Sequence, residues 1–147
     1  MRFHESVHDI YFDDLDIFGI LHNARYLLLF ERTIGSFWRK IGYHDPENPT
    51  QVTQDDHQHY VRQNLVEYLK PVVGVGQVRV RVWVEKLGRT SLTFGLKMFA
   101  MDADEEYAIG NRVVVRVDPE TRKPAPWSQT CRDRLEPFLE TLAQSVT

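Results

Sequence analysis

The chain has a single cysteine, Cys131, and no long hydrophobic run among its 147 residues. One cysteine excludes a disulfide within the chain and is typical of proteins from reducing compartments. The most apolar window, residues 26–30, is far too short to cross a bilayer. The first residues, Met1 to Glu5, lack the apolar run of a signal peptide. We therefore expect a cytoplasmic protein that does not insert into membranes.

Positive charge is also scarce. The chain has 18 lysines and arginines against 21 aspartates and glutamates, and its formal net charge is −3. Nucleic-acid binding requires an excess of positive charge concentrated on one face, so we expect no nucleic-acid partner. The length and the 42% hydrophobic content suffice for one hydrophobic core, and we expect residues 1–147 to form a single domain.

Apolar residues recur at spacings of three and four between residues 24 and 41, which predicts a long helix over this range. They are Tyr26, Leu27, Phe30, Ile34, Phe37, Trp38 and Ile41. Gly42 follows the last of them and is expected to end the helix. Residues 45–49 contain two prolines and are expected to form a loop.

Beyond residue 58 the hydrophobic pattern changes to alternation, which is typical of half-buried strands. We expect strands near residues 3–12, 58–69, 77–87, 91–101 and 106–117. Residues 127–143 have helical spacing, but Pro137 should break or restart that helix. The order of these elements predicts an α+β fold with one buried helix against an antiparallel sheet.

The stretch from Asp14 to Tyr26 leads from two carboxylates through a glycine turn into the long helix. The N-terminus of a helix offers free backbone N–H groups and a positive dipole, which can stabilise an oxyanion. Asp16, seven residues before Asn23, can fold back across a turn at Gly19 toward these donors. This is the layout of an acyl-transfer site, and it is equally the layout of a simple capped turn.

The same stretch carries the pattern D-x-D-x-x-G followed by N-x-x-Y. Three later segments complete the set: Tyr68-Leu69-Lys70-Pro71, the hairpin Gly88-Arg89-Thr90-Ser91, and Asp118-Pro119. On these motifs the chain resembles, over nearly its whole length, the 4-hydroxybenzoyl-CoA thioesterase family of hotdog-fold acyl-CoA thioesterases. The resemblance implies a five-stranded antiparallel sheet wrapped around one central helix.

The resemblance also implies roles for particular residues. Asp16 matches the catalytic carboxylate, and the backbone amide of Asn23 matches a donor of the oxyanion hole, with the Ala24 amide as a second candidate donor. Cations at strand ends flanking the Gly88 turn are expected to contact the phosphates of coenzyme A, from a neighbouring subunit in some members. The full set of expected substrate-binding residues is Gly19, His22, Tyr26, Phe30, Lys86, Arg89 and Ser91, with Lys70 as a further cation.

Thioester hydrolysis needs only one carboxylate, because a thiol leaves as a thiolate without a strong acid. Asp16 can act as a general base for water, or it can attack the carbonyl carbon and form an anhydride. The sequence leaves both routes open. Coenzyme A is part of the substrate, and we expect no other cofactor. Hotdog domains are expected to form homodimers or homotetramers, since the edges of the sheet can pair.

Two alternatives remain beside hydrolysis of a fatty or aromatic acyl-CoA. A hydratase or dehydratase on the same scaffold would want a histidine as general base at the helix turn, where this chain has Asp16. A non-catalytic acyl-CoA-binding domain would need no carboxylate aimed at the thioester. A metal site is not expected, because His57-x-His59 lacks a third ligand at a diagnostic spacing.

Overall fold

The central helix α1 runs from Arg25 to Lys40 in the computed structural model, which describes residues 2–43 and 58–140. It begins one residue later and ends one residue earlier than the sequence pattern predicts. Its apolar stripe is buried, with Phe30, Phe37 and Trp38 each at most 4% exposed. Gly42 follows with a φ of 100°, a conformation that favours glycine, and so the helix ends where expected.

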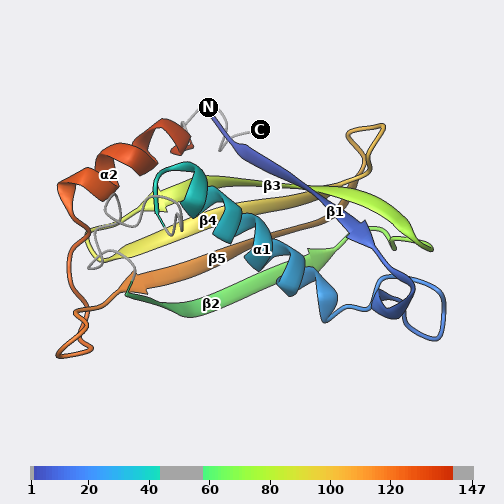
Figure 1. Cartoon of the computed structure of the whole chain (residues 1–147), viewed down its shortest axis with the longest axis horizontal. Helices are drawn as coiled ribbons and strands as arrows, with labels where there is room; N and C mark the ends of the chain where they lie inside the picture. Colours follow the sequence, from blue (N-terminus) through green and yellow to red (C-terminus); the bar gives the residue numbers. More distant parts are fainter. Residues whose placement is uncertain (1, 44–57, 141–147) are drawn as a thin grey trace.

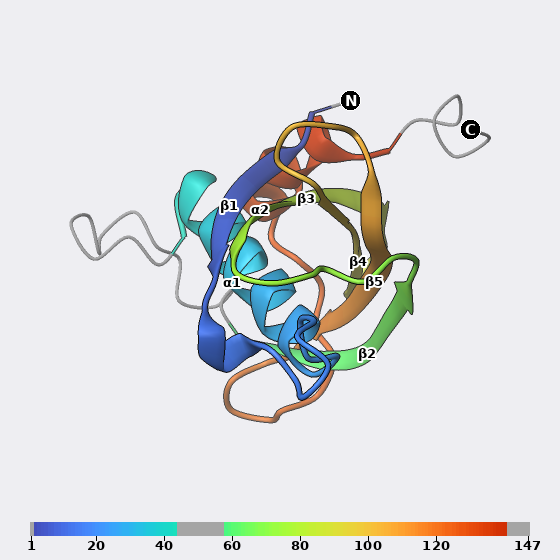
Figure 2. The ribbon, with the colours of Figure 1, turned by 90° about the vertical axis from the view of Figure 1, so that its right-hand side faces the viewer.

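Five antiparallel strands form one sheet that curves around α1 (Figures 1 and 2). In chain order they are β1 (His4–Ile10), β2 (His59–Tyr68), β3 (Gly76–Leu87), β4 (Ser91–Phe99) and β5 (Glu106–Arg116). Their order across the sheet is β1-β3-β4-β5-β2, so β1 and β2 are its edges. The expected α+β hotdog arrangement is confirmed, and the strand ranges agree closely with those predicted from alternation.

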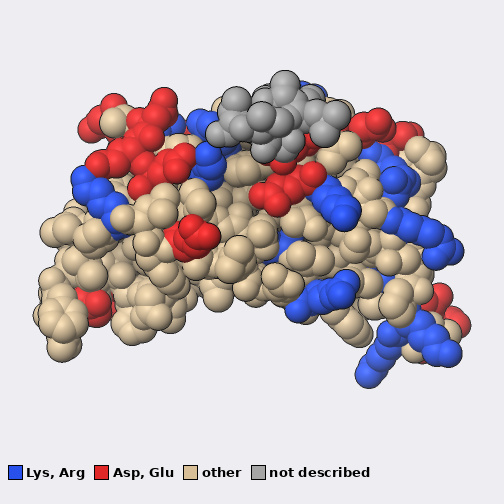
Figure 3. Space-filling model, turned by 180° about the vertical axis from the view of Figure 1, so that it is seen from behind, with Lys and Arg blue, Asp and Glu red and all other residues tan. Residues whose placement is uncertain are grey.

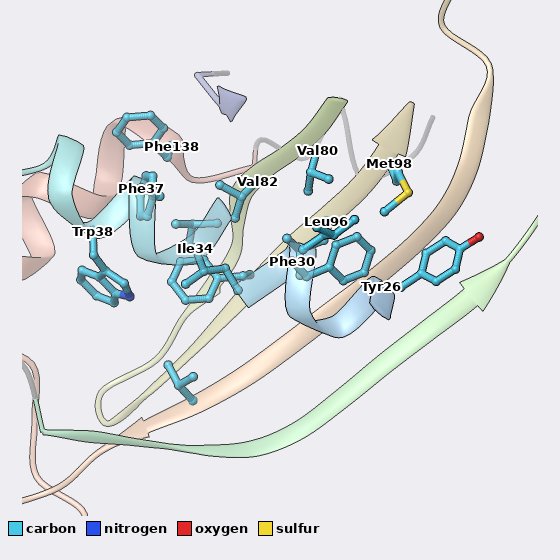
Figure 4. Packing of buried hydrophobic residues seen from close by; sticks show 14 of the residues in the cluster. Tyr26, Phe30, Ile34, Phe37, Trp38, Val80, Val82, Leu96, Met98 and Phe138 are labelled. Carbon is cyan, nitrogen blue, oxygen red and sulfur yellow. The ribbon is translucent and has the colours of Figure 1, made fainter. Parts of the chain in front are cut away.

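Alternate residues of β3 and β4 face α1 and form the core (Figure 4). The members of this row that are at most 1% exposed are Val78, Val80, Val82, Val84, Leu92, Phe94, Leu96 and Met98. Phe37 of α1 packs edge-to-face against Phe94 and Phe138, with ring centroids 5.8 and 4.9 Å away. Removal of this apolar surface from water holds the helix against the sheet.

Two histidines of β1 connect the edge of the sheet to α1. His4 Nε2 lies 2.8 Å from Ser36 Oγ, and His8 Nε2 lies 2.7 Å from Thr33 Oγ1. The Thr33 hydroxyl donates to the Leu29 carbonyl at 3.0 Å, so its oxygen accepts the hydrogen bond that His8 Nε2–H donates. Burial lowers the pKa of both histidines. This edge of the helix is therefore held by polar contacts rather than by apolar packing alone.

The outer face of the sheet carries the alternate set of side chains, and uncharged residues cover much of it (Figure 3). Trp83 of β3 lies across Gly95 of β4, where a Cβ atom would come within 2.4 Å of the indole ring. Arg81 packs over Phe3 and pairs with Glu5 at 3.2 Å. The close approach of Trp83 explains why β4 has glycine at this point of the strand.

The C-terminal segment closes one end of the core. Helix α2 runs from Gln129 to Leu135, and a 3-10 turn at Glu136–Phe138 follows it, so Pro137 interrupts the helix as predicted. The predicted loop at 45–49 and the end of the predicted tail helix, 141–143, lie outside the described residues. Within residues 2–43 and 58–140, no helix is long and apolar enough to cross a membrane.

Candidate active site

The chain between β1 and α1 forms a short hairpin with Gly19 at its tip. Leu15 and Leu21 face each other in an antiparallel bridge. The Asp16 N–H donates to the Ile20 carbonyl at 2.9 Å, and the Gly19 N–H donates to the Asp16 carbonyl at 3.0 Å. Gly19 has a φ of 74°, which a residue with a Cβ adopts only at a cost. The hairpin returns the chain to the start of α1 and brings Asp16 with it.

The Asp16 carboxylate is fixed by its own turn. Its Oδ1 atom accepts the Phe18 N–H at 2.8 Å and the Ile20 N–H at 3.4 Å. Its Oδ2 atom accepts no hydrogen bond from the described residues, and the side chain is only partly exposed. Asp16 thus forms the capped turn that its sequence context suggests and still has one oxygen available to a ligand.

The first backbone amides of the helix are used unequally. The Ala24 N–H donates to His22 Nδ1 at 3.1 Å, and the Arg25 N–H donates to the His22 carbonyl at 2.9 Å. The Asn23 N–H finds no acceptor within residues 2–43 and 58–140. Of these three amides, that of Asn23 is therefore free for a ligand, and the Ala24 amide, the second candidate donor, is already occupied by His22.

Tyr68, near the end of β2, orients the peptide at the start of the helix. Its hydroxyl donates to the Asn23 carbonyl at 3.0 Å. Its ring packs edge-to-face on Tyr26, with centroids 4.9 Å apart. Sequence reasoning missed this role, because Tyr68 is 45 residues from Asn23 and no local pattern links them.

A pocket of about 390 Å³ brings these groups together. Its walls are Asp16, Ile20, Leu21, Asn23, Tyr26, Tyr68, Leu69, Lys70 and Pro71. Tyr26 is 3% exposed, and its burial, with a smaller contribution from Tyr68, raises the pKa of its phenol. Most of the wall is apolar, with a carboxylate at one point and a cation at another. The pocket can hold an acyl group against a carboxylate and a free backbone donor.

Not all of the expected substrate-binding residues reach this pocket. Of the four expected around the helix start, only Tyr26 is part of its wall. Gly19 forms the hairpin tip, His22 caps the helix, and Phe30 is 1% exposed within the core. Phe18, beside Asp16, is 78% exposed and points away from the core.

The expected phosphate-binding cations lie in two different places. Lys70 is in the pocket wall, where an ion pair with Glu105 raises its pKa. Lys86, Arg89 and Ser91 lie at the β3–β4 turn. Strand β3 starts beside the Gly19 hairpin: Gly74, two residues before the strand, donates its N–H to the Gly19 carbonyl at 2.9 Å.

Eleven residue steps along β3 then span roughly 36 Å. Within one chain, therefore, Lys86, Arg89 and Ser91 are far from Asp16. The expectation that Lys70 flanks the Gly88 turn is wrong, since Lys70 follows β2 at the opposite end of the sheet.

Two other carboxylates near the helix have structural partners. Asp14 Oδ2 accepts the Tyr11 N–H at 2.8 Å, and Asp14 Oδ1 lies 3.7 Å from Arg25 Nε. Glu31 pairs with Arg112 at 3.5 Å. These contacts account for both residues without a catalytic role.

Residues 2–43 and 58–140 contain no group of three or more His, Cys, Asp or Glu side chains that could hold an ion. His57 lies outside the described residues. His59 stacks on the Trp38 ring, with centroids 5.3 Å apart.

Solved structures share this arrangement over most of their length. A protein from Bacillus stearothermophilus described as a predicted thioesterase superposes with a TM-score of 0.80 at 18% identity, covering 95% of this chain and 98% of that one. A 1,4-dihydroxy-2-naphthoyl-CoA thioesterase from Synechocystis gives 0.76 at 11% identity, covering 91% and 96%. At these identities the likeness shows the fold.

A thioesterase from Thermus thermophilus, crystallised with coenzyme A and zinc, is 28% identical, with a TM-score of 0.73 and coverage of 90% and 96%. Among curated proteins, none matches the sequence. Residues 10–135 match the sequence profile of the Thioesterase-like superfamily. This range is most of the chain and includes the Gly19 hairpin, the helix α1 and the whole of strands β2 to β5. The chain therefore belongs to the Thioesterase-like superfamily of hotdog-fold proteins.

Proposed function

We propose that this protein is an acyl-CoA thioesterase that hydrolyses a fatty or aromatic acyl-CoA to the free acid and coenzyme A. One observation carries the proposal: Asp16 and Asn23, whose backbone N–H is free, line a single pocket with mostly apolar walls. A thioester carbonyl that accepts the Asn23 N–H would have its carbon close to Asp16. The acyl group would then lie against Tyr26 and Leu21.

The chemistry requires a nucleophile at the carbonyl carbon and a donor for the oxygen on which negative charge develops. Removal of one oxyanion donor typically costs on the order of 3 kcal/mol of barrier. In one route, Asp16 accepts a proton from water, the water oxygen bonds to the carbonyl carbon, and the C–S bond breaks to release the thiolate. In the other route, Asp16 bonds to the carbon first, and water opens the anhydride after the thiolate has left. Both routes use the same two groups.

Coenzyme A phosphates need cations, and Lys70 is the cation that the described residues place in the pocket wall. Lys86, Arg89 and Ser91 are too distant within one chain, so we assign them to the site of a partner subunit. Strand β2 is an edge, and most of its residues are exposed. Antiparallel pairing of two β2 strands about a two-fold axis would turn the partner's β3–β4 end toward Asp16. The protein would be a homodimer or homotetramer with shared sites.

Related structures support coenzyme A as part of the ligand. The Thermus thermophilus thioesterase was crystallised with coenzyme A, and so was a Staphylococcus aureus protein that superposes with a TM-score of 0.80 at 12% identity. The hydratase alternative has less support, because His22, the histidine beside the pocket, is engaged with the Ala24 N–H. The acyl-CoA-binding alternative shares the pocket and leaves the free oxygen of Asp16 without a use.

The test is thiol release from a panel of acyl-CoAs, read with a thiol reagent, for the wild type and Asp16→Ala. The proposal expects release by the wild type and a severe loss in the variant. Loss of enoyl absorbance without thiol release would indicate a hydratase. Calorimetric binding of acyl-CoA without either reaction would indicate a binding domain.

A further inference from the structure

A second pocket, of about 270 Å³, lies at the other end of the seam between α1 and β2. Its walls include Glu31, Trp38, His59 and Arg112. The first pocket contains Tyr26 of α1, twelve residues before Trp38. Since an α-helix rises 1.5 Å per residue, Tyr26 and Trp38 are roughly 18 Å apart along the axis. The second pocket is therefore separate from the pocket that Asp16 lines, although both lie between α1 and β2.

The base of this pocket is a buried cation with incomplete pairing. Arg112 is 6% exposed and lies on the side of β5 that faces α1. Its Nε atom donates to Asn64 Oδ1 at 2.7 Å, and its Nη1 atom is 3.5 Å from the Glu31 carboxylate, whose side chain is 63% exposed. Its Nη2 atom donates to no acceptor among the described residues. Burial lowers the pKa of Arg112, and Glu31 opposes that shift.

A second donor in the wall also lacks a partner. Trp38 is 4% exposed, and its buried Nε1–H has no hydrogen-bond acceptor in the part of the chain that the structure describes. The buried indole is held in place by the rings of His59 and Trp127, whose centroids lie 5.3 and 6.2 Å from its own and 6.1 Å from each other. The Tyr43 ring packs edge-to-face against the indole of Trp38. Figure 4 shows Trp38 within the core. An indole N–H only donates, so this atom calls for an acceptor.

We propose that this pocket binds a carboxylate group, with Arg112 and Trp38 as its donors. A carboxylate presents two acceptor oxygens in one plane, which suits a guanidinium and a fixed N–H together. Among the described residues, Arg112 is the one Lys or Arg in the wall, and Glu31 already offsets part of its charge, so a monoanion fits better than a phosphate dianion. Glu31 is exposed enough to move aside as the ligand carboxylate approaches Arg112.

The carboxylate can come from two sources. It can be the far end of an acyl chain whose thioester lies at Asp16, in which case the inference rests on the proposed function. It can also be a free carboxylic acid that binds independently of catalysis. The pocket requires the same donors in both cases, and separate measurements distinguish them.

Direct binding tests the pocket without relying on catalysis. Calorimetry on the full-length protein would compare benzoate with benzamide, which has the same shape and no charge. We expect the wild type to prefer benzoate at least about tenfold. Glu31→Gln should tighten benzoate binding several-fold, because it removes the competing anion. Trp38→Phe should weaken it by about 2- to 10-fold through the loss of one donor, and Glu120→Gln, a charge change in an exposed turn, should leave it unchanged.

Equal binding of benzoate and benzamide would overturn the proposal, and so would a Glu31→Gln variant with unchanged or weaker benzoate binding. Glu31 is largely exposed, so this second criterion holds even if Trp38→Phe folds poorly.

Hydrolysis then identifies the source. Hexadecanedioyl-CoA and palmitoyl-CoA have the same chain length, which is enough to reach from one pocket to the other, but only hexadecanedioyl-CoA ends in a carboxylate. If the acyl chain is the source, KM for hexadecanedioyl-CoA falls in Glu31→Gln and rises in Trp38→Phe, while KM for palmitoyl-CoA changes in neither. If the variants change benzoate binding but not KM for the acyl-CoA that ends in a carboxylate, the ligand of this pocket is a free acid. A protein that hydrolyses no acyl-CoA would contradict the proposed function, and the calorimetry would still decide for or against the pocket.

Discussion

The Tyr68 hydroxyl donates a hydrogen bond to the Asn23 backbone carbonyl at 3.0 Å, across a sequence separation of 45 residues. This bond joins the end of β2 to the peptide that precedes α1, next to the free Asn23 N–H. The Tyr68 side chain is half exposed, so water competes for this hydrogen bond, and the side chain is not part of the hydrophobic core. We infer that it orients the donor of the proposed oxyanion hole.

Replacement of Tyr68 by phenylalanine tests this orientation. A hydrogen bond of this kind contributes about 0.5–1.5 kcal/mol, so kcat should fall about 2- to 10-fold in Tyr68→Phe. KM should change little, because the ring that packs on Tyr26 remains. Tyr60→Phe is a matched control, since Tyr60 is on the same strand and is equally exposed. A wild-type kcat in Tyr68→Phe would show that the Tyr68 hydroxyl does not orient the oxyanion donor.

The fold was predictable because its signals are local and repeated. The three- and four-residue spacing of α1 and the alternation of Val78 to Val84 each define a buried face. The turn at Gly19 was predictable for the same reason, since its hydrogen bonds join residues only a few positions apart.

The site was only partly predictable. The contact of Tyr68 with Asn23 and the pairing of Glu31 with Arg112 join elements that are distant in sequence, so no spacing reveals them. The sequence interpretation also misplaced Lys70 beside the Gly88 turn, although the whole length of β3 separates the end of β2 from that turn. Tertiary arrangement decides such contacts.

Stability should decrease in mild acid through His8. Burial is the main cause that lowers the folded-state pKa of His8 below its ordinary value of 6.5. As the pH falls below that value, the unfolded chain takes up a proton before the folded one does, so the free energy of unfolding decreases. In His8→Gln the amide can still donate to Thr33, but the titration is removed.

The loss of unfolding free energy between about pH 7 and about pH 5.5, measured by urea denaturation, should therefore be smaller in His8→Gln than in the wild type. His4→Gln should act in the same direction, because burial also lowers the pKa of His4. An equal loss in His8→Gln and the wild type would show that this contact does not sense pH.

Shared sites predict complementation between two inactive variants. If Lys86 and Arg89 act on the partner's Asp16 site, a mixture of Asp16→Asn with Lys86→Ala/Arg89→Ala forms hybrids with one fully wild-type site. Random exchange of equal amounts makes half of the dimers hybrid, so activity should rise to about a quarter of the wild-type value. Exchange is verified by mass. Verified exchange without recovery, or a stable monomer that hydrolyses acyl-CoA, would contradict shared sites.

The most direct measurement is the rate of thiol release from acyl-CoA by Asp16→Asn. Asparagine keeps an oxygen that accepts the Phe18 and Ile20 N–H groups, so the turn is retained while the negative charge is lost. Asp14→Asn is the matched control, because Asp14 is a turn carboxylate outside the pocket wall. The account predicts a fall of at least about a hundredfold in Asp16→Asn, near-wild-type rates in Asp14→Asn, and calorimetric binding of a non-hydrolysable acyl-CoA thioether to all three proteins. Equal rates in Asp16→Asn and the wild type would contradict the catalytic role of Asp16 and leave it only its place in the turn.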